Sequence, residues 1–363
     1  MTRKQMTTGT IYPGIDVMKF VMAMMVVAAH VPPFPSGTFL FQVMAVVDRL
    51  AVPYFFMATG FLLFCKMDLP RMDDRRVWNY CKRMTRLYVL WNLVYLPMAV
   101  IFIKLSHQVF WSTFLKMFFL QGGFGHLWFL HACLLGILLS AGMYVRRWRF
   151  SVMLAVGCFL YVVFLCGMTY HFLYQQLVPE GTSFSAFCGV AEELLGSTRH
   201  GLFFAPVFFL LSAYVAQAVQ RGRTCLGQRR AGQLFAVFFV AFLAEGFVCE
   251  ALGSSRLEGF LFAVPVVYFL FLLSLSWRSS YLAMCKCLRE RSMLVYFTHV
   301  WVVYFVFRLF DPQRGAALGG QAWTALPPYA CYFLTLLGAL AVSEFLIRLR
   351  THRLGGWVRY LYQ

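Results

Sequence analysis

Three ionisable residues lie in one strongly apolar stretch near the N-terminus, IDVMKFVMAMMVVAAH, residues 15–30. On an α-helix with about 100° and 1.5 Å per residue, Lys19 and His30 point only ~20° apart and lie roughly 16 Å apart along the axis. Asp16 lies three residues before Lys19, close enough to pair with it. Histidine titrates near neutrality and is therefore suited to general base catalysis. The spacing predicts a helix that carries Asp16 and Lys19 near one end and His30 near the other, with Lys19 and His30 on one face.

The composition places this helix in a membrane. Of 363 residues, 61% are hydrophobic and 13% are charged, which is far from the composition of a soluble domain. A spanning helix needs about 20 apolar residues, and ten stretches qualify: 15–31, 45–65, 86–105, 126–145, 150–170, 201–220, 232–251, 258–277, 292–310 and 327–347. We therefore predict an all-α fold, a polytopic membrane helix bundle of about ten transmembrane helices. It would form a single domain over 1–363, with spans over 15–347 and a basic tail at 348–363.

Basic residues are distributed unequally between alternate loops. If the N-terminus is inside, 24 of the 32 Lys and Arg residues lie in inner segments and 6 in outer segments. The positive-inside rule then predicts that both termini are cytoplasmic. A basic membrane face also explains the net charge of +18 and makes anionic membrane lipid the expected partner, with no nucleic acid. Glu344, near the cytoplasmic end of the last span, should pair with a basic residue there. The eleven cysteines contain no CxxC pair, and we expect no metal site.

Several segments, in order along 11–348, resemble the acyltransferase-3 family of integral membrane acyltransferases. The basic residue, ten residues and histidine of 15–30 are similar to the first helix of that family, and RMTR at 83–86 fits its Arg-x-x-Arg pattern. The resemblance extends to the branch that includes O-acetyltransferases of surface glycans and the membrane part of membrane-bound serine racemases. The segments that carry it are VPYFFMATGFLL (52–63), HLWFL (126–130), TRHGLFFAPVFFLLSAY (198–214) and MLVYFTHVWVV (293–303).

The resemblance implies acyl transfer across a bacterial inner membrane. An acyl group, expected to be acetyl, would move from cytoplasmic acyl-coenzyme A to a hydroxyl of a surface glycan or another envelope acceptor near the outer face. Acyl-coenzyme A would be a co-substrate, and we expect no permanently bound cofactor. Arg83 and Arg86, backed by Lys82 and Arg76, offer forked donors to its phosphates. The alternative for this segment is an interfacial anchor of snorkelling basic side chains.

The same resemblance makes His30 the expected general base for the acceptor hydroxyl. A base normally needs another group to fix its tautomer, and Glu245 or Asp48 could be that group. Lys19 and Asp16, at the cytoplasmic end of the helix, would handle the donor. The alternatives are an interface ion pair for Lys19 and Asp16, and a histidine that merely caps the helix end for His30.

Five further residues are candidates for acceptor binding. Arg199 would hold the acceptor or the transferred carbonyl, or it is a helix-end anchor. His126 and Trp128 would form a stacking platform for a sugar, with core packing as the alternative. His299 and Tyr296 lie deep enough in a predicted span to line a cavity.

Two other classes of function stay open. A small-molecule, amino-acid transport module is the main alternative, because buried charges also mark substrate paths. A non-catalytic scaffold for envelope assembly is the other. The sequence leaves the acceptor, the acyl chain length, a covalent acyl-enzyme step and the oligomeric state open.

Overall fold

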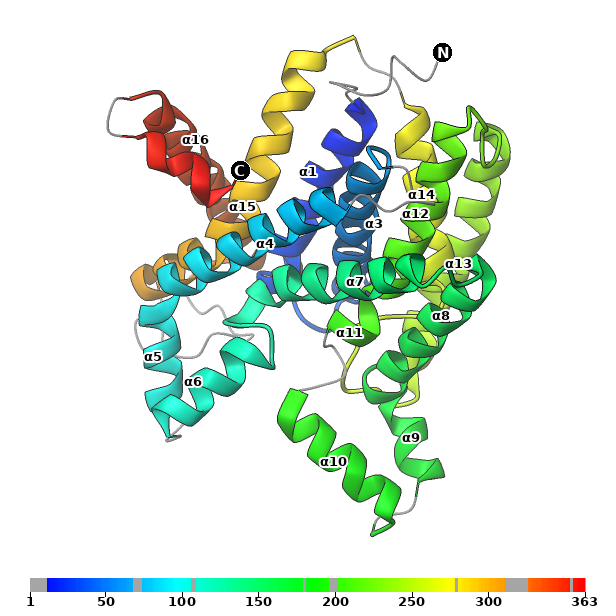
Figure 1. The fold of residues 1–363 in the computed structure, drawn as a ribbon. Helices are drawn as coiled ribbons and strands as arrows, with labels where there is room; N and C mark the ends of the chain where they lie inside the picture. The colour runs from blue at the N-terminus through cyan, green and yellow to red at the C-terminus, as the bar shows by residue number, and fades with distance from the viewer. Residues whose placement is uncertain are drawn as a thin grey trace. The chain divides into compact units, whose positions relative to one another are not determined.

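A computed structural model describes residues 12–67, 74–105, 109–178, 181–195, 201–277, 280–310, 326–352 and 355–362. Within these ranges all regular structure is helical, in sixteen α-helices and three short 3-10 helices (Figure 1). The predicted all-α fold class is therefore confirmed.

The chain separates into two compact units, which we describe in turn. The α1 unit contains Ile11–Phe55, Gln228–Leu243 and Phe269–Gln363, and the α7 unit contains Phe56–Gly227 and Ala244–Tyr268. Three helices begin in one unit and end in the other: α3 (Ala51–Phe64), α13 (Gln228–Ala251) and α14 (Ala263–Ser276).

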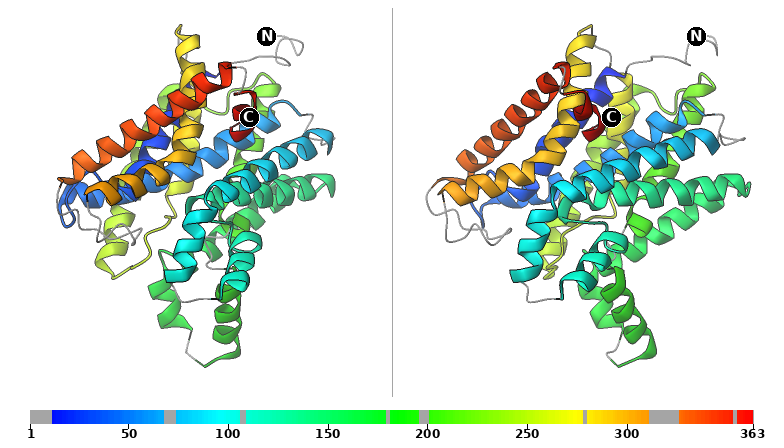
Figure 2. Two further views of the ribbon diagram at one scale, coloured as in Figure 1. Left: turned by 90° about the vertical axis from the view of Figure 1, so that its left-hand side faces the viewer. Right: turned by 60° about the vertical axis from the view of Figure 1, so that its left-hand side comes forward.

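The α1 unit is built on a stack of long helices. Its elements are α1 (Pro13–His30), α2 (Phe39–Val47), η2 (Asp48–Leu50), α15 (Leu282–Phe310), α16 (Pro328–Thr351) and η4 (Gly356–Leu361). Helix α1 packs against α15, and α15 runs beside α16 (Figure 2). Proline at the first position of α1 suits a helix start, because its missing N–H would have no partner there.

One glycine permits a close approach between two helices of this unit. A Cβ on Gly14, in the first turn of α1, would lie 2.0 Å from the carbonyl oxygen of Ser274 in α14. The side chain of Ser274 also exchanges a 2.8 Å hydrogen bond with the hydroxyl of Tyr54. The start of α1 is therefore fixed against neighbouring backbone before the helix reaches its charged residues.

The α7 unit contains the remaining helices. They are α4 (Asp74–Val94), α5 (Leu96–Leu105), α6 (Phe110–Phe119), η3 (Gly125–Leu127), α7 (Trp128–Val145), α8 (Phe150–Gly167), α9 (His171–Leu177), α10 (Ser183–Leu195), α11 (Gly201–Phe204) and α12 (Pro206–Gln220). Helix α4 packs on α7, and α8 packs on α11 and α12. An aromatic cluster fills the centre: Phe56 stacks on Phe129 with ring centroids 5.0 Å apart, and Phe204 stacks on Phe164 at 4.4 Å.

The helices confirm a multi-pass membrane protein. Among the described residues, seven helical segments are long and apolar enough to span a membrane, or eight if the bent pair α4 and α5 is one span. Each of the ten predicted spans coincides with helical structure, but α14 has only 14 residues. The count of ten spans, the orientation of the termini and the single-domain organisation stay predictions.

The prediction of one continuous span at 86–105 is wrong in one respect. The structure breaks it into α4 and α5, which meet at 57°. Pro97 follows this break. Proline has no N–H to donate, and its ring clashes with the carbonyl of the preceding turn, so the helix cannot continue straight.

Candidate active site

Two histidines meet in the α1 unit. The ring centroids of His30, the last residue of α1, and His299, in α15, lie 5.0 Å apart, with the rings tilted by 47°. His299 is completely buried, and His30 is exposed. Sequence analysis treated them as a base and a separate cavity-lining residue. The structure places them side by side.

The backbone of α15 determines which nitrogen of His299 carries the proton. Its Nδ1 lies 2.8 Å from the carbonyl oxygen of Tyr296 and 3.1 Å from that of Val295. Because a carbonyl can only accept a hydrogen bond, Nδ1 must be the protonated nitrogen. In the neutral ring, Nε2 therefore carries the lone pair.

Aromatic side chains flank this pair. The ring of Tyr296 lies 6.2 Å from that of His299, and the ring of Phe55 lies 6.3 Å from that of Tyr296 in an edge-on arrangement. Tyr296 is only 6% exposed. His299 thus lies beside aromatic side chains supplied by α3 and α15.

A buried ion pair lies at the other end of α1. Arg289 donates from Nε and Nη2 to the two carboxylate oxygens of Asp16, each over 2.7 Å. Asp16 is 1% exposed, and its hydrogen bonds raise the pKa of Arg289. Sequence analysis missed Arg289, although a carboxylate in an apolar helix requires a cation from elsewhere. Lys19 is also buried on α1, and the role of Asp16 in holding it stays a prediction.

The two predicted orienting carboxylates each make contacts in the structure, and their role toward His30 stays a prediction. In the α1 unit, Asp48 on η2 forms a 3.3 Å ion pair with Arg49. In the α7 unit, Glu245 accepts hydrogen bonds from the hydroxyl of Tyr170 at 2.5 Å and from two backbone N–H groups just before α14, those of Leu261 at 2.5 Å and Phe262 at 2.8 Å. Glu245 therefore caps the N-terminus of α14, where a negative charge is favoured.

Burial and the bond to Glu245 raise the pKa of Tyr170, which lies beyond the end of α8. Its hydroxyl therefore stays protonated and donates to the carboxylate. Sequence analysis missed this pair, because 75 positions separate Tyr170 from Glu245 along the chain.

The predicted donor residues lie on α4, within the α7 unit. Arg83 is half-buried, whereas Arg76, Lys82 and Arg86 are exposed. The ammonium group of Lys82 lies 5.2 Å from the ring centroid of the exposed Trp78, a cation–π contact. The opposite face of the helix is buried and apolar, with Val77, Cys81, Met84 and Tyr88. Helix α4 thus presents a basic face, with Arg83 and Arg86 ~60° apart around it.

The predicted sugar platform is packed into an aromatic cluster of the α7 unit. His126 on η3 is 5% exposed and lies edge-on to Tyr95, with centroids 4.9 Å apart. Trp128, at the start of α7, stacks on Phe204 at 5.9 Å. These contacts favour the core-packing alternative for both residues. Arg199, the remaining acceptor candidate, lies outside the described residues.

One polar side chain shapes the loop that carries His126. Asn92 accepts a hydrogen bond from the N–H of Phe124 at 3.1 Å and donates to the carbonyl of Tyr88 at 2.8 Å. Gly123, beside it, has a positive φ of 85°, a conformation in which a Cβ would be strained. The buried Asn92 therefore fixes this loop on α4, a role that sequence analysis did not identify.

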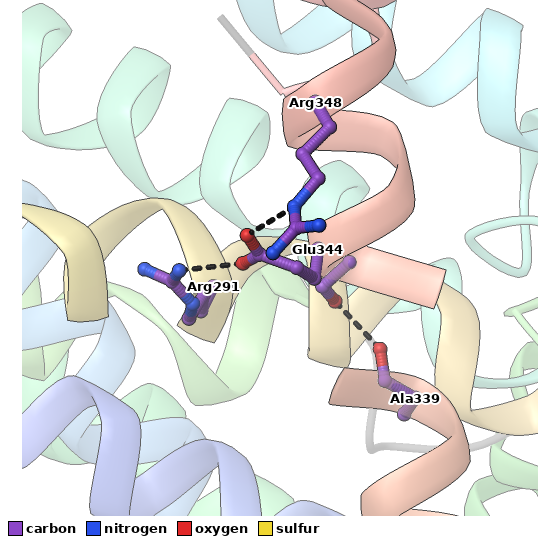
Figure 3. Close-up of polar contacts among 5 residues, drawn as sticks. Arg291, Ala339, Glu344 and Arg348 are labelled. Carbon is purple, nitrogen blue, oxygen red and sulfur yellow. Dashed lines mark hydrogen bonds and ion pairs between the residues drawn. The ribbon is translucent and has the colours of Figure 1, made fainter. Parts of the chain in front are cut away.

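Charged side chains also join α15 to α16 in the α1 unit (Figure 3). Glu344 accepts hydrogen bonds from Arg291 at 2.5 Å and from Arg348 at 3.0 Å. Arg350 donates to Glu290 at 3.0 Å. The prediction that Glu344 pairs with a basic residue is confirmed. Among the residues that the structure describes, no group of three or more His, Cys, Asp or Glu residues could hold a metal ion.

Comparison with known proteins identifies a family that the chain matches. The model of the acyltransferase-3 family, described as an acyltransferase domain, matches residues 12–344. The chain is 30% identical over 275 residues to a serine/alanine racemase of Enterococcus gallinarum, covering 73% of this chain and 37% of that protein. It is 29% identical over 298 residues to an amino-acid racemase of Enterococcus faecalis, covering 81% and 41%. The chain thus spans about two fifths of the length of these relatives. No solved structure matches it.

Proposed function

Because this chain belongs to the acyltransferase-3 family of membrane proteins, we propose that it transfers an acyl group, in the simplest case acetyl, from cytoplasmic acyl-coenzyme A. The acceptor is a hydroxyl of a surface glycan or another envelope component near the outer face of a bacterial inner membrane. The observation that carries the proposal is the imidazole of His30, at the end of an apolar helix and beside the buried His299. An imidazole in this position is suited to remove a proton from an incoming hydroxyl.

The reaction needs one base and one leaving group. The acceptor oxygen attacks the thioester carbonyl while His30 takes the hydroxyl proton, and a carbon–oxygen bond forms. The carbon–sulfur bond then breaks, and the proton passes from His30 to the coenzyme A thiolate. Atoms and charge balance without any further reactant.

The basic face of α4 is proposed to hold the donor. Coenzyme A carries several phosphate groups, and the planar guanidinium groups of Arg83 and Arg86 match phosphate oxygens in a forked geometry. Lys82 and Arg76 add positive charge on the same exposed part of the helix. In the α1 unit, Lys19 and Asp16, with its partner Arg289, are proposed to take part in donor handling.

A second candidate is an amino-acid transport module. The names of the two relatives, serine/alanine racemase and amino-acid racemase, favour it. A membrane part joined to a racemase could carry the amino-acid substrate to that enzyme. Buried charges of the kind seen at Asp16 also occur along substrate paths.

One paired experiment tests both candidates. Purified protein is incubated with acetyl-coenzyme A labelled in the acetyl group and with glycan or amino-acid acceptors, and labelled product is separated by chromatography. The same preparation is reconstituted into vesicles and assayed for uptake of labelled serine. Transfer of label to a hydroxyl supports the enzyme. Serine uptake with no acyl transfer would replace the enzyme by the transporter.

A further inference from the structure

Helix α6 of the α7 unit carries an apolar stripe that the protein leaves exposed. The stripe consists of Trp111, Leu115 and Phe119, which are 69%, 48% and 63% exposed. Because residues four apart lie on the same face of a helix, these three side chains form one continuous row. No residue of α6 is buried by the part of the chain that the structure describes. The stripe therefore faces whatever surrounds the protein at this point.

One side of α6, next to the stripe, is attached to α4. Phe110, Phe114 and Phe118 stack along the helix with ring centroids 5.7 and 6.0 Å apart. The ring of Phe118 lies 5.1 Å from that of Tyr88 on α4, and the Tyr88 hydroxyl donates to the carbonyl of Phe118. This aromatic row lies about 100° around the helix from the stripe. The contact with α4 therefore turns the stripe outward.

The other side of α6 is polar. Ser112 is exposed, and the ammonium group of Lys116 donates to the carboxylate of Glu193 on α10 over 3.2 Å. The side chain of Glu193 is 76% exposed, so this ion pair requires water or lipid headgroups around it. The polar edge lies about 100° from the stripe, on the side opposite to the aromatic row. Helix α6 is thus amphipathic.

The composition around the stripe indicates lipid as its partner. Residues 96–120 include two Lys and no Asp or Glu, whereas a face that docks another protein normally has a polar rim. Exposed apolar residues lead along the chain into α6, from Leu93 at the end of α4 through Ile101 on α5, and α6 runs beside α5 (Figure 1). Helix α8, which is long and apolar enough to span a membrane, exposes side chains of the same kind, such as Phe159.

Helix α6 is too short to cross the membrane. Its ten residues extend about 15 Å, half of the ~30 Å hydrocarbon core. We propose that α6 lies flat in the membrane interface, with the stripe in contact with the acyl chains of one leaflet and the Lys116 edge toward water. Tryptophan and lysine side chains favour this level of the bilayer. Since α6 follows the end of α4 that is remote from its basic start, this leaflet is the outer one in the predicted orientation.

Spin labelling measures this placement, and it does not depend on acyl transfer. The Trp111→Cys, Ser112→Cys, Leu115→Cys and Phe119→Cys variants of a cysteine-free full-length chain carry a nitroxide in vesicles of phosphatidylcholine and phosphatidylglycerol. Power saturation compares collisions with oxygen, which dissolves in lipid, and with a water-soluble nickel chelate. We expect positions 111, 115 and 119 to favour oxygen at similar depths, about 5–10 Å below the headgroups. Position 112 is the matched control and should favour nickel.

Three outcomes would overturn the proposal. Frequent collisions with nickel at the stripe would place it in water. Rare collisions with both reagents would mean that protein covers the stripe, for example a second copy of this chain. A depth that increases by about 12 Å from position 111 to position 119, the rise of eight residues, would show that α6 points into the bilayer.

A second measurement uses the protein with all its cysteines. Tryptophan emission is recorded in vesicles of phosphatidylcholine whose acyl chains are brominated near the headgroup, because bromine quenches tryptophan at close range. We expect Trp111→Phe to be quenched less than the wild type. Trp91→Phe is the control, since Trp91 on α4 is 3% exposed and its removal should not lower the quenched fraction. Equal quenching of the wild type and Trp111→Phe would contradict the contact of Trp111 with lipid.

Discussion

At the scale of single residues, both buried carboxylates of the apolar helices are hydrogen-bonded. Asp16 accepts hydrogen bonds from two nitrogens of Arg289, and Glu245 accepts them from a tyrosine hydroxyl and two backbone N–H groups. An unpaired buried carboxylate would cost several kcal/mol. The sequence identified these acids as unusual. It did not identify their partners, because Arg289 approaches Asp16 from a helix far along the chain.

Removal of Arg289 should destabilise the protein strongly. Arg289→Ala leaves the 1% exposed Asp16 carboxylate without its bidentate partner, and we expect a loss of about 3 kcal/mol in the free energy of unfolding. Arg348→Ala is the control, because its side chain is 79% exposed and Glu344 keeps Arg291. It should cost less than about 1 kcal/mol. Equal melting temperatures of the two variants in detergent would show that the Asp16 contact contributes little.

The basic face of α4 leads to a prediction on donor binding. Arg83→Ala or Arg86→Ala should weaken coenzyme A binding by roughly 1.5–3 kcal/mol, the scale of a hydrogen bond to a charged group. Lysine at either position should restore affinity only in part, because an ammonium group lacks the planar fork. Calorimetry with coenzyme A measures this, with the exposed Arg221 changed to Ala as a control. Wild-type affinity in Arg86→Ala would reduce the segment to an interfacial anchor.

At the scale of helices, hydropathy predicted where helices lie but not how they bend or approach one another. The apolar run at 86–105 reads as one span, and only the proline at position 97 hints at the 57° break between α4 and α5. The span predicted at 292–310 belongs to α15, which begins ten residues earlier, at Leu282. Its first turns carry Arg289 and Arg291, whose ion pairs with Asp16 and Glu344 offset the cost of charge in an apolar helix.

Close helix packing at Gly201 is a testable consequence of this arrangement. A Cβ at Gly201 would lie 2.1 Å from Cα of Ala132, so α11 cannot pack on α7 unchanged. We expect Gly201→Ala to destabilise the protein by roughly 1–3 kcal/mol, as overpacking does. Gly189→Ala in α10 meets open space and should be neutral or slightly stabilising. The melting temperatures of the two variants provide the comparison. A Gly201→Ala protein as stable as Gly189→Ala would contradict the packing.

At the scale of the whole molecule, composition and charge distribution were sufficient to predict the class of protein. A chain with 61% hydrophobic residues and a strong excess of basic residues in alternate loops predicts a multi-pass membrane protein, and the helices confirm it. The contact of His30 with His299 was not predictable in the same way, because it depends on α1 packing against α15 across most of the sequence.

The orientation in the membrane follows from the charge distribution and can be measured. Both termini and residue 75, at the start of α4, should lie in the cytoplasm. A single cysteine introduced at position 75 of a cysteine-free variant should resist an impermeant thiol reagent added to intact cells and react after the membrane is opened. A cysteine at position 110, in the predicted outer segment, is the control with the opposite pattern. Labelling of position 75 from outside would remove the cytoplasmic donor.

The central claim is that His30 performs the chemical step and does not bind the donor. Wild-type protein and His30→Ala are therefore compared in two measurements on the same preparations, acyl transfer from labelled acetyl-coenzyme A and calorimetric binding of coenzyme A. We predict that His30→Ala loses about 10²- to 10⁴-fold in transfer, the contribution of a positioned base, while its coenzyme A affinity stays that of the wild type. A His30→Ala protein that transfers at the wild-type rate would contradict this assignment and leave His30 as a histidine at a helix end.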